Sequence, residues 1–163
     1  YHFRSKEHLL IEAQRATFQR IHREFDDRFQ AGDRGLKTAL DGIDALWDAF
    51  CGMRTWTPFI VETMSLAGQD RAIRPYVDEF YTESTMLLER GIRNVFEADL
   101  AQLAMPPERL AWVIRTALHG LVMELALART PTQMAKVDQT YRDLRNMFAQ
   151  AVLDAPLPSE VMP

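Results

Sequence analysis

The sequence has little cysteine, glycine or proline. Its 163 residues include one cysteine, seven glycines and eight prolines. Because Cys51 is the sole thiol, an internal disulfide is excluded, as in most proteins of a reducing compartment. No segment keeps the alternation of apolar and polar residues typical of a β-strand. Metalloprotease, phosphate-loop, nucleophile-elbow and di-iron motifs are also absent, so we expect no metal, no cofactor and no enzymatic activity.

Positive charge and long apolar runs are scarce as well. The net charge of −4 differs in sign from that of a general nucleic-acid binder. Residues 1–25 contain five basic and three acidic side chains, a balance of +2, which leaves −6 for the rest. The most apolar stretch, residues 118–128, is interrupted by Gly120 and Glu124 and is shorter than the roughly 20 residues that span a bilayer. We expect a soluble, cytoplasmic protein without a membrane partner.

Apolar residues recur at spacings of three and four along the chain, which predicts an all-α fold. The expected helices, about six, cover residues 5–32, 36–50, 58–68, 70–96, 108–129 and 131–152. Thr57 is expected to cap the third helix, with Pro58 in its first turn, and Thr130 with Pro131 should begin the sixth. The fifth helix is apolar on nearly all sides, so neighbours must cover more than one of its faces.

The opening of the chain contains the most specific motif. It reads Tyr1-His2-Phe3-Arg4-Ser5-Lys6-Glu7-His8-Leu9-Leu10, an aromatic turn followed directly by a helix start. The phenol of Tyr1 and the imidazole of His2 can donate hydrogen bonds to phosphate oxygens. Lys6 would lie in the first turn of a helix whose free N–H groups attract anions. On spacing alone, the segment also fits an ordinary capped helix with a basic, solvated start.

This motif resembles the end of the DNA-binding domain in the tetracycline-repressor (TetR) family. There the recognition helix closes with a Tyr-His-Phe type of turn, and the next helix opens with Ser-Lys-Glu-x-Leu. The resemblance implies that residues 1–4 end a helix-turn-helix domain whose remainder lies upstream, that residues 5–155 form a ligand-binding and dimerisation domain, and that residues 156–163 are a tail. It also implies contacts from Tyr1, His2 and Lys6 to the phosphates of operator DNA.

The function that the resemblance implies is that of a ligand-responsive transcriptional regulator, in particular a repressor. In this family a small molecule inside the helical body alters the spacing of two DNA-reading heads in a homodimer. The alternative is an all-α interaction or scaffold module that does not bind DNA. The residues preceding Tyr1 discriminate between the two, because only a regulator requires a helix-turn-helix there.

A pocket for a small, mainly apolar or aromatic effector is expected among the bulky side chains of the helical body. Its candidate residues are Trp47, Phe50, Met53, Trp56, Phe59, Met64, Tyr76, Phe80, Trp112, Arg115, His119 and Met123. Methionines allow the walls of such a pocket to change shape. Each apolar member taken singly fits the hydrophobic core better, so the pocket prediction rests on the set as a whole.

Arg115 and His119 are four residues apart and share one face of an otherwise apolar helix. A buried charge on that face needs a partner. An internal carboxylate or contact with solvent would satisfy Arg115. The other possibility is that the two residues orient an acidic or phenolic ligand.

The fifth and sixth helices are the predicted homodimer surface, packed with their copies as a four-helix bundle. The candidate interface residues are Ala117, Gly120, Leu121, Glu124, Val137, Tyr141, Leu144 and Phe148. The small side chains among them would allow helices to approach closely. The alternative is that the fifth helix is the central helix of a monomer.

Overall fold

The computed structural model describes residues 11–12, 15–16, 18–19, 23 and 33–153. Its α-helices are α2 (Leu36–Gly52), α3 (Thr57–Ala67), α4 (Arg74–Val95), α5 (Pro107–Leu127) and α6 (Pro131–Ala151), with short 3-10 turns η1 (Arg54–Trp56) and η2 (Leu100–Gln102). The described residues hold no strand, only an isolated bridge between Leu103 and Leu153. The predicted all-α fold is confirmed. The predictions for Tyr1, His2, Lys6 and the tail fall outside the described residues.

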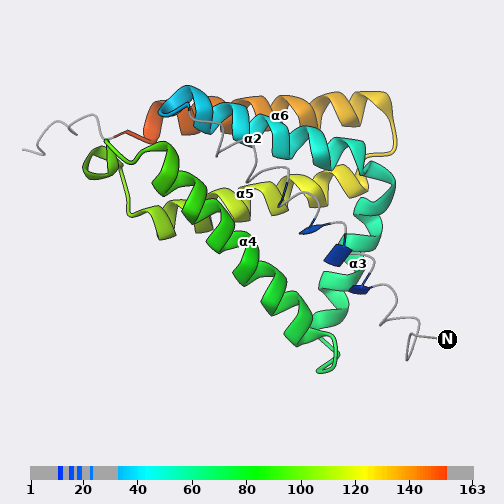
Figure 1. The fold of residues 1–163 in the computed structure, drawn as a ribbon. Helices are drawn as coiled ribbons and strands as arrows, with labels where there is room; N and C mark the ends of the chain where they lie inside the picture. The colour runs from blue at the N-terminus through cyan, green and yellow to red at the C-terminus, as the bar shows by residue number, and fades with distance from the viewer. Residues whose placement is uncertain (1–10, 13–14, 17, 20–22, 24–32, 154–163) are drawn as a thin grey trace, which may run out of the picture.

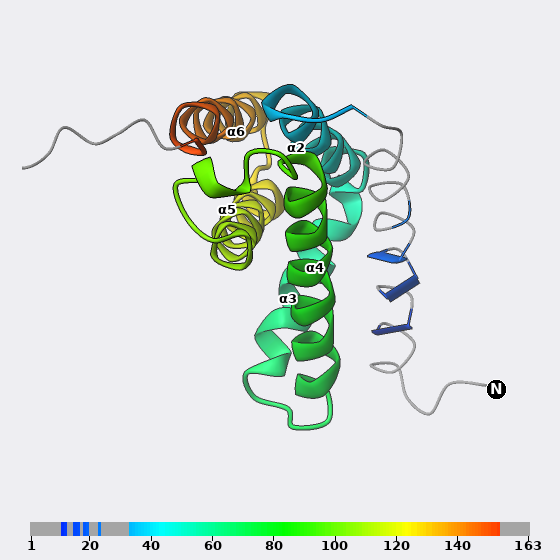
Figure 2. The ribbon, with the colours of Figure 1, turned by 60° about the vertical axis from the view of Figure 1, so that its left-hand side comes forward.

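Helix α5 is the centre of the bundle. It contacts α2, α3, α4 and α6, and its most extensive contact is with α4. Helices α2 and α6 lie side by side over α5, while α4 crosses it and extends toward α3 (Figures 1 and 2). The expectation that neighbours cover several faces of this helix is therefore confirmed.

The composition of α5 requires one correction to the sequence analysis. With 21 residues and a mean hydropathy of 1.4 in its most apolar window, it is long and apolar enough to cross a membrane, the one such helix among those described. Gly120 and Glu124 do not lower its mean hydropathy enough to exclude this. The central helix of a soluble bundle has the same composition, and α5 has that position here.

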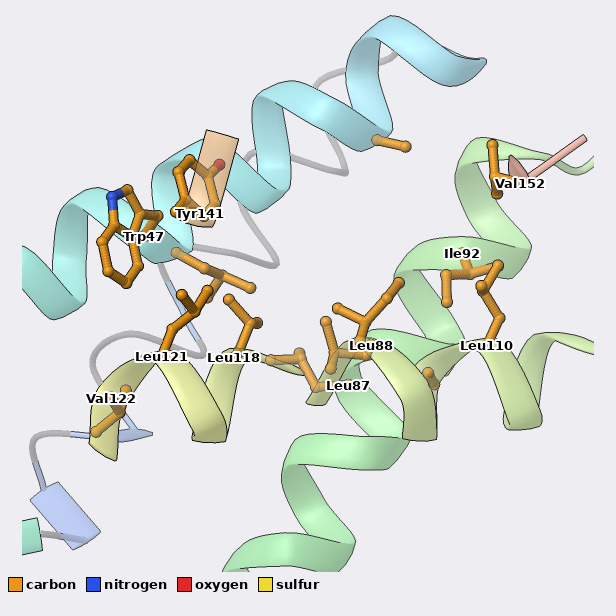
Figure 3. Packing of buried hydrophobic residues seen from close by; sticks show 14 of the residues in the cluster. Trp47, Leu87, Leu88, Ile92, Leu110, Leu118, Leu121, Val122, Tyr141 and Val152 are labelled. Atoms are coloured by element: carbon orange, nitrogen blue, oxygen red, sulfur yellow. The ribbon is translucent and has the colours of Figure 1, made fainter. Parts of the chain in front are cut away.

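The hydrophobic core joins all five helices around α5. Leu118, Leu121 and Val122 project from α5 toward the surrounding helices, and Leu87 and Leu88 approach from α4 (Figure 3). Burial of such side chains, each contributing about 2 kcal/mol, is the main stabilising term for a chain without disulfides. The core extends to Phe18 in the N-terminal segment, whose described positions are helical.

A network of polar side chains links α2 to α6 beside this core. Arg145 donates from Nε and Nη2 to the two carboxylate oxygens of Asp44, at 2.7 and 2.8 Å. Tyr141 donates its hydroxyl hydrogen bond to the same carboxylate. The ring of Tyr141 stacks on that of Trp47 with centroids 4.8 Å apart (Figure 3). Trp47 Nε1 donates to Asp138. Each of these polar groups therefore has a partner.

Most helix ends follow the glycine and proline pattern. The fourth helix, however, begins at Arg74 and not at residue 70 as expected, because the Asp70 carboxylate accepts from the N–H of Ala72 and residues 71–73 form a turn. Gly35 has a φ of 88°, which disfavours a side chain, and its N–H bonds to the Val95 carbonyl at the end of α4. Thr130 and Gln133 form a complete capping box at the start of α6, as expected from Thr130 with Pro131. Thr57, however, is not the cap of α3, because it lies inside the helix and donates to the carbonyl of Arg54.

Candidate functional site: a pocket between four helices

A pocket opens between α2, α3, α4 and α5. About 620 Å³ of space, part of it open to solvent, lies between its walls. Its apolar walls consist of Phe18, Leu46, Phe50, Ile60, Met64, Phe80, Leu87, Leu88, Leu118 and Val122. Four polar residues, Tyr81, Ser84, Arg115 and His119, complete the lining. Mostly apolar walls with a few grouped polar side chains are typical of sites for small organic molecules.

The polar residues come from facing turns of α4 and α5. Tyr81 Oη lies 2.6 Å from His119 Nδ1 and 3.3 Å from the sulfur of Met64, so its single proton has two possible acceptors. The rings of Tyr81 and His119 lie 5.5 Å apart and nearly parallel. These contacts hold both side chains at the wall of the pocket.

Burial sets the protonation of this pair. It lowers the pKa of His119, and the nearby charge of Arg115 lowers that pKa further. Burial raises the pKa of the Tyr81 hydroxyl, an effect that Arg115 opposes. At neutral pH the phenol therefore keeps its proton and the imidazole is uncharged. When the phenol donates to Nδ1, the imidazole proton lies on Nε2; when it donates to Met64, the Nδ1–H donates to the phenol oxygen.

Arg115 differs from the other polar residues of the pocket because it has no hydrogen-bond or ion-pair partner among the residues that the structure describes. Its Cζ lies 4.5 Å from the ring centroid of Tyr81 and 5.7 Å from that of Trp112. Its Nε is buried without a hydrogen-bond acceptor, and none of the ion pairs within the described part of the chain includes it. The internal carboxylate considered as a partner in the sequence analysis is therefore absent from these residues, whereas contact with solvent, the other possibility, fits a side chain that is only half-buried. A buried, unpaired N–H of a cation is energetically costly, so it marks a place for an incoming acceptor.

A second hollow, whose space of about 540 Å³ includes open solvent, adjoins the pocket on the side of the N-terminal segment. The two spaces share Phe18, Met64 and Phe80, and the rings of Phe18 and Phe80 lie 4.0 Å apart between their centroids. Arg15 and Glu79 form a 3.0 Å ion pair at the wall of the second hollow. Side chains of the N-terminal segment thus line both spaces.

The pocket contains five of its sequence-predicted residues: Phe50, Met64, Phe80, Arg115 and His119. Tyr76 lines the second hollow instead. Trp47 and Met53 are core residues, and Phe59 is half-buried without lining either space. Trp56, Trp112 and Met123 are exposed side chains. Of the four candidates on α5, the structure therefore places Arg115 and His119 in the pocket and leaves the other two outside it.

Two polar pocket residues, Tyr81 and Ser84, were not singled out from the sequence. They lie one turn apart on α4, opposite His119, but their spacing does not distinguish them from solvent-exposed residues of an amphipathic helix. The pairing of Tyr81 with a histidine 38 positions later depends on how α4 crosses α5. A pattern within one helix carries no signal for that contact.

The predicted dimer residues lie on two different sides of their helices. Leu121, Val137 and Tyr141 are buried in the core of the single chain, and Leu144 and Phe148 pack against that core. Ala117 is half-buried, whereas Gly120 and Glu124 are exposed. The outer side of α5 also exposes Trp112, Val113, Met123 and Leu127, an apolar set at helical spacing around Gly120.

Neither metal nor thiol chemistry has a site in the described residues. No group of histidine, cysteine and carboxylate side chains there could hold a metal ion. The Cys51 thiol is half-buried, and burial, together with Asp138 and Asp48, raises its pKa. A thiol of this kind is protonated and weakly reactive.

Comparison with known proteins gives no relative. No family model, no curated protein and no solved structure matches the chain.

Proposed function

We propose that this chain is the ligand-binding body of a transcriptional regulator resembling the TetR family. The observation that carries the proposal is the apolar pocket whose polar wall includes the unpaired Arg115. A core that served stability alone would not favour a half-buried cation whose buried Nε lacks an acceptor among the described residues. The motif at residues 1–10 adds the DNA-binding part, with Tyr1, His2 and Lys6 as the proposed phosphate contacts.

Phe18 supplies a physical link between ligand and DNA. It belongs to the segment that follows the opening motif, and its ring lines the pocket formed by α2 to α5. A ligand that contacts Phe18 and α5 together stabilises one position of that segment over another. In the proposed mechanism this population shift changes the spacing of two DNA-reading heads and lowers operator affinity.

The proposed regulator acts as a homodimer in the cytoplasm. The outer side of α5 is the proposed contact, because Trp112, Val113 and Leu127 expose 57%, 45% and 64% of their surfaces there. Gly120 lies among them, and no atom lies within 4 Å of a Cβ built on it, so a second helix could approach closely. Contiguous exposed apolar residues of this kind mark association surfaces.

Light scattering tests the dimer with a matched pair of variants. Leu127→Glu places a charge on the outer side of α5, and Met86→Glu places one on α4 at nearly the same exposure, 64% against 63%. We expect a dimer for the wild-type chain and Met86→Glu and a monomer for Leu127→Glu, with equal helical circular dichroism. A wild-type chain that is monomeric at micromolar concentration contradicts the dimer.

The DNA-binding role has a direct test in the gene. We expect the codons preceding Tyr1 to encode a helix-turn-helix, and the intact product to shift the mobility of DNA from its own upstream region. A pocket ligand should reduce that shift, whereas a different kind of upstream sequence excludes the regulator.

The second candidate is a helical interaction module, favoured by the exposed apolar side of α5 alone. Such a module would keep that surface but would neither bind DNA nor respond to a ligand. Association through this side of α5 that Leu127→Glu abolishes, together with absence of DNA binding, would favour it.

A further inference from the structure

The environment of Arg115 indicates the chemical class of the ligand. Its guanidinium contacts Tyr81 and Trp112, with Cζ 4.5 and 5.7 Å from their ring centroids. Aromatic contacts of this type attract the cation without using its N–H groups as hydrogen-bond donors. The buried Nε has no acceptor in the part of the chain that the structure describes. The residue is held in place, yet its donors are available to a ligand.

The other polar residues at this wall carry no formal charge. The Tyr81 hydroxyl and His119 Nδ1, 2.6 Å apart, share one hydrogen bond. The histidine is uncharged at neutral pH because burial, with a second contribution from Arg115, lowers its pKa. Since Arg115 contributes one positive charge to a mostly apolar space, a monoanion balances it. A carboxylate matches the planar N–H fork of a guanidinium, whereas a phosphate dianion would leave one negative charge unbalanced.

The remaining walls define the body of the guest. Phe18, Phe50 and Phe80 contribute three aromatic rings, from the N-terminal segment, α2 and α4. Aromatic rings pack on one another in offset or tilted arrangements, and the free energy of such a contact is more favourable than its buried area alone would give. An aromatic guest therefore fits this lining.

We propose that the ligand is a small aromatic monocarboxylate whose carboxylate pairs with Arg115 and whose ring lies among Phe18, Phe50 and Phe80. The inference rests on the proposed ligand-binding function and names the substrate class of the same pocket. It also assigns separate roles to the two kinds of lining, since Arg115 selects the charge and the phenylalanines select the ring.

Calorimetric titration of the whole chain with 2-naphthoate and with its neutral isostere 2-naphthamide tests the proposal. We expect 2-naphthoate to bind at least about tenfold more tightly. Arg115→Met should remove this preference, and Arg115→Lys should keep part of it. Arg109→Met is the matched control, because Arg109 is exposed on the same helix and lies outside the pocket, so the full preference should remain.

Each contrary result has a distinct meaning. Equal affinity for the two compounds in the wild type, or a preference that survives Arg115→Met, overturns the carboxylate inference. If the two compounds bind equally and Ser84→Phe, which fills the pocket, abolishes the binding of both, the proposed ligand-binding function stands and only the preference for a carboxylate is wrong. Absence of binding by both compounds overturns the inference and counts against the pocket itself. Thermal unfolding of each variant without ligand verifies that it is folded.

Discussion

Two polar clusters in this molecule contain the same kinds of side chain but differ in how they are satisfied. Between α2 and α6, Arg145 donates twice to Asp44, which also accepts from Tyr141. Between α4 and α5, Arg115 lies over the ring of Tyr81, and its buried Nε has no acceptor in the described part of the chain. Each cluster thus combines an arginine with a tyrosine, and of the residues described, only those of the first cluster include a carboxylate.

This difference separates a structural role from a binding role. A buried polar group stabilises a fold only when its hydrogen bonds are made, and one without partners is a cost. The Asp44 cluster meets that condition within the chain. The Arg115 cluster meets it only when an acceptor enters the pocket. The comparison therefore makes three predictions, from the largest expected effect to the smallest.

Loss of the carboxylate in the first cluster should have the largest effect. Asp44→Ala leaves Tyr141 and Arg145 without their acceptor, so we expect the free energy of unfolding to fall by about 2 kcal/mol. Asp48→Ala removes an exposed carboxylate one turn further along α2 and should cost less than about 0.5 kcal/mol. Urea unfolding measures both. Equal losses in the two variants would show that the Asp44 cluster is not a stabilising network.

The two arginines should respond differently to the same substitution. Arg145→Met should lower the free energy of unfolding by about 1 to 2 kcal/mol, because Asp44 loses two hydrogen bonds. Arg115→Met removes an unsatisfied donor and should change it by less than about 0.5 kcal/mol in the absence of ligand. Urea unfolding of both variants makes the comparison. A loss at Arg115 as large as that at Arg145 would give Arg115 a structural role.

The smallest effect is a pH dependence at His119. Burial, with Arg115 as a second cause, lowers the pKa of this imidazole below its ordinary 6.5. The unfolded chain therefore binds a proton near pH 6.5, and the folded chain binds it only at lower pH. Stability from this residue is present above pH 6.5 and is lost as the pH falls below it. His119→Gln should flatten the fall in unfolding free energy between pH 7.5 and 5.5, and an unchanged slope would contradict this.

Helix boundaries and fold class could be predicted from the sequence because they depend on local signals. Thr130 with Pro131 begins α6 where the capping pattern predicts, whereas the same logic at Thr57 fails because its hydroxyl bonds backwards to Arg54. The exact start of α3 depends on the 3-10 turn before it, which no pattern indicated.

The pocket could be predicted only in part, because periodicity groups residues on a face without showing what covers it. Trp112, Arg115, His119 and Met123 do lie on one side of α5, as their spacing indicates. The edge of α4 divides this group, leaving Arg115 and His119 inside and the other two exposed. In the same way, the contact of Tyr141 with Trp47 and Asp44 depends on how α6 lies over α2.

Nuclear magnetic resonance of the arginine Nε–H groups tests the central claim most directly, because it compares Arg115 with Arg145 in one sample. Without ligand, we expect the Arg145 proton downfield, in its hydrogen bond to Asp44, and the Arg115 proton upfield of it. Addition of 2-naphthoate should move only the Arg115 proton downfield. An Arg115 signal that is downfield from the start and unmoved by the carboxylate would contradict the account.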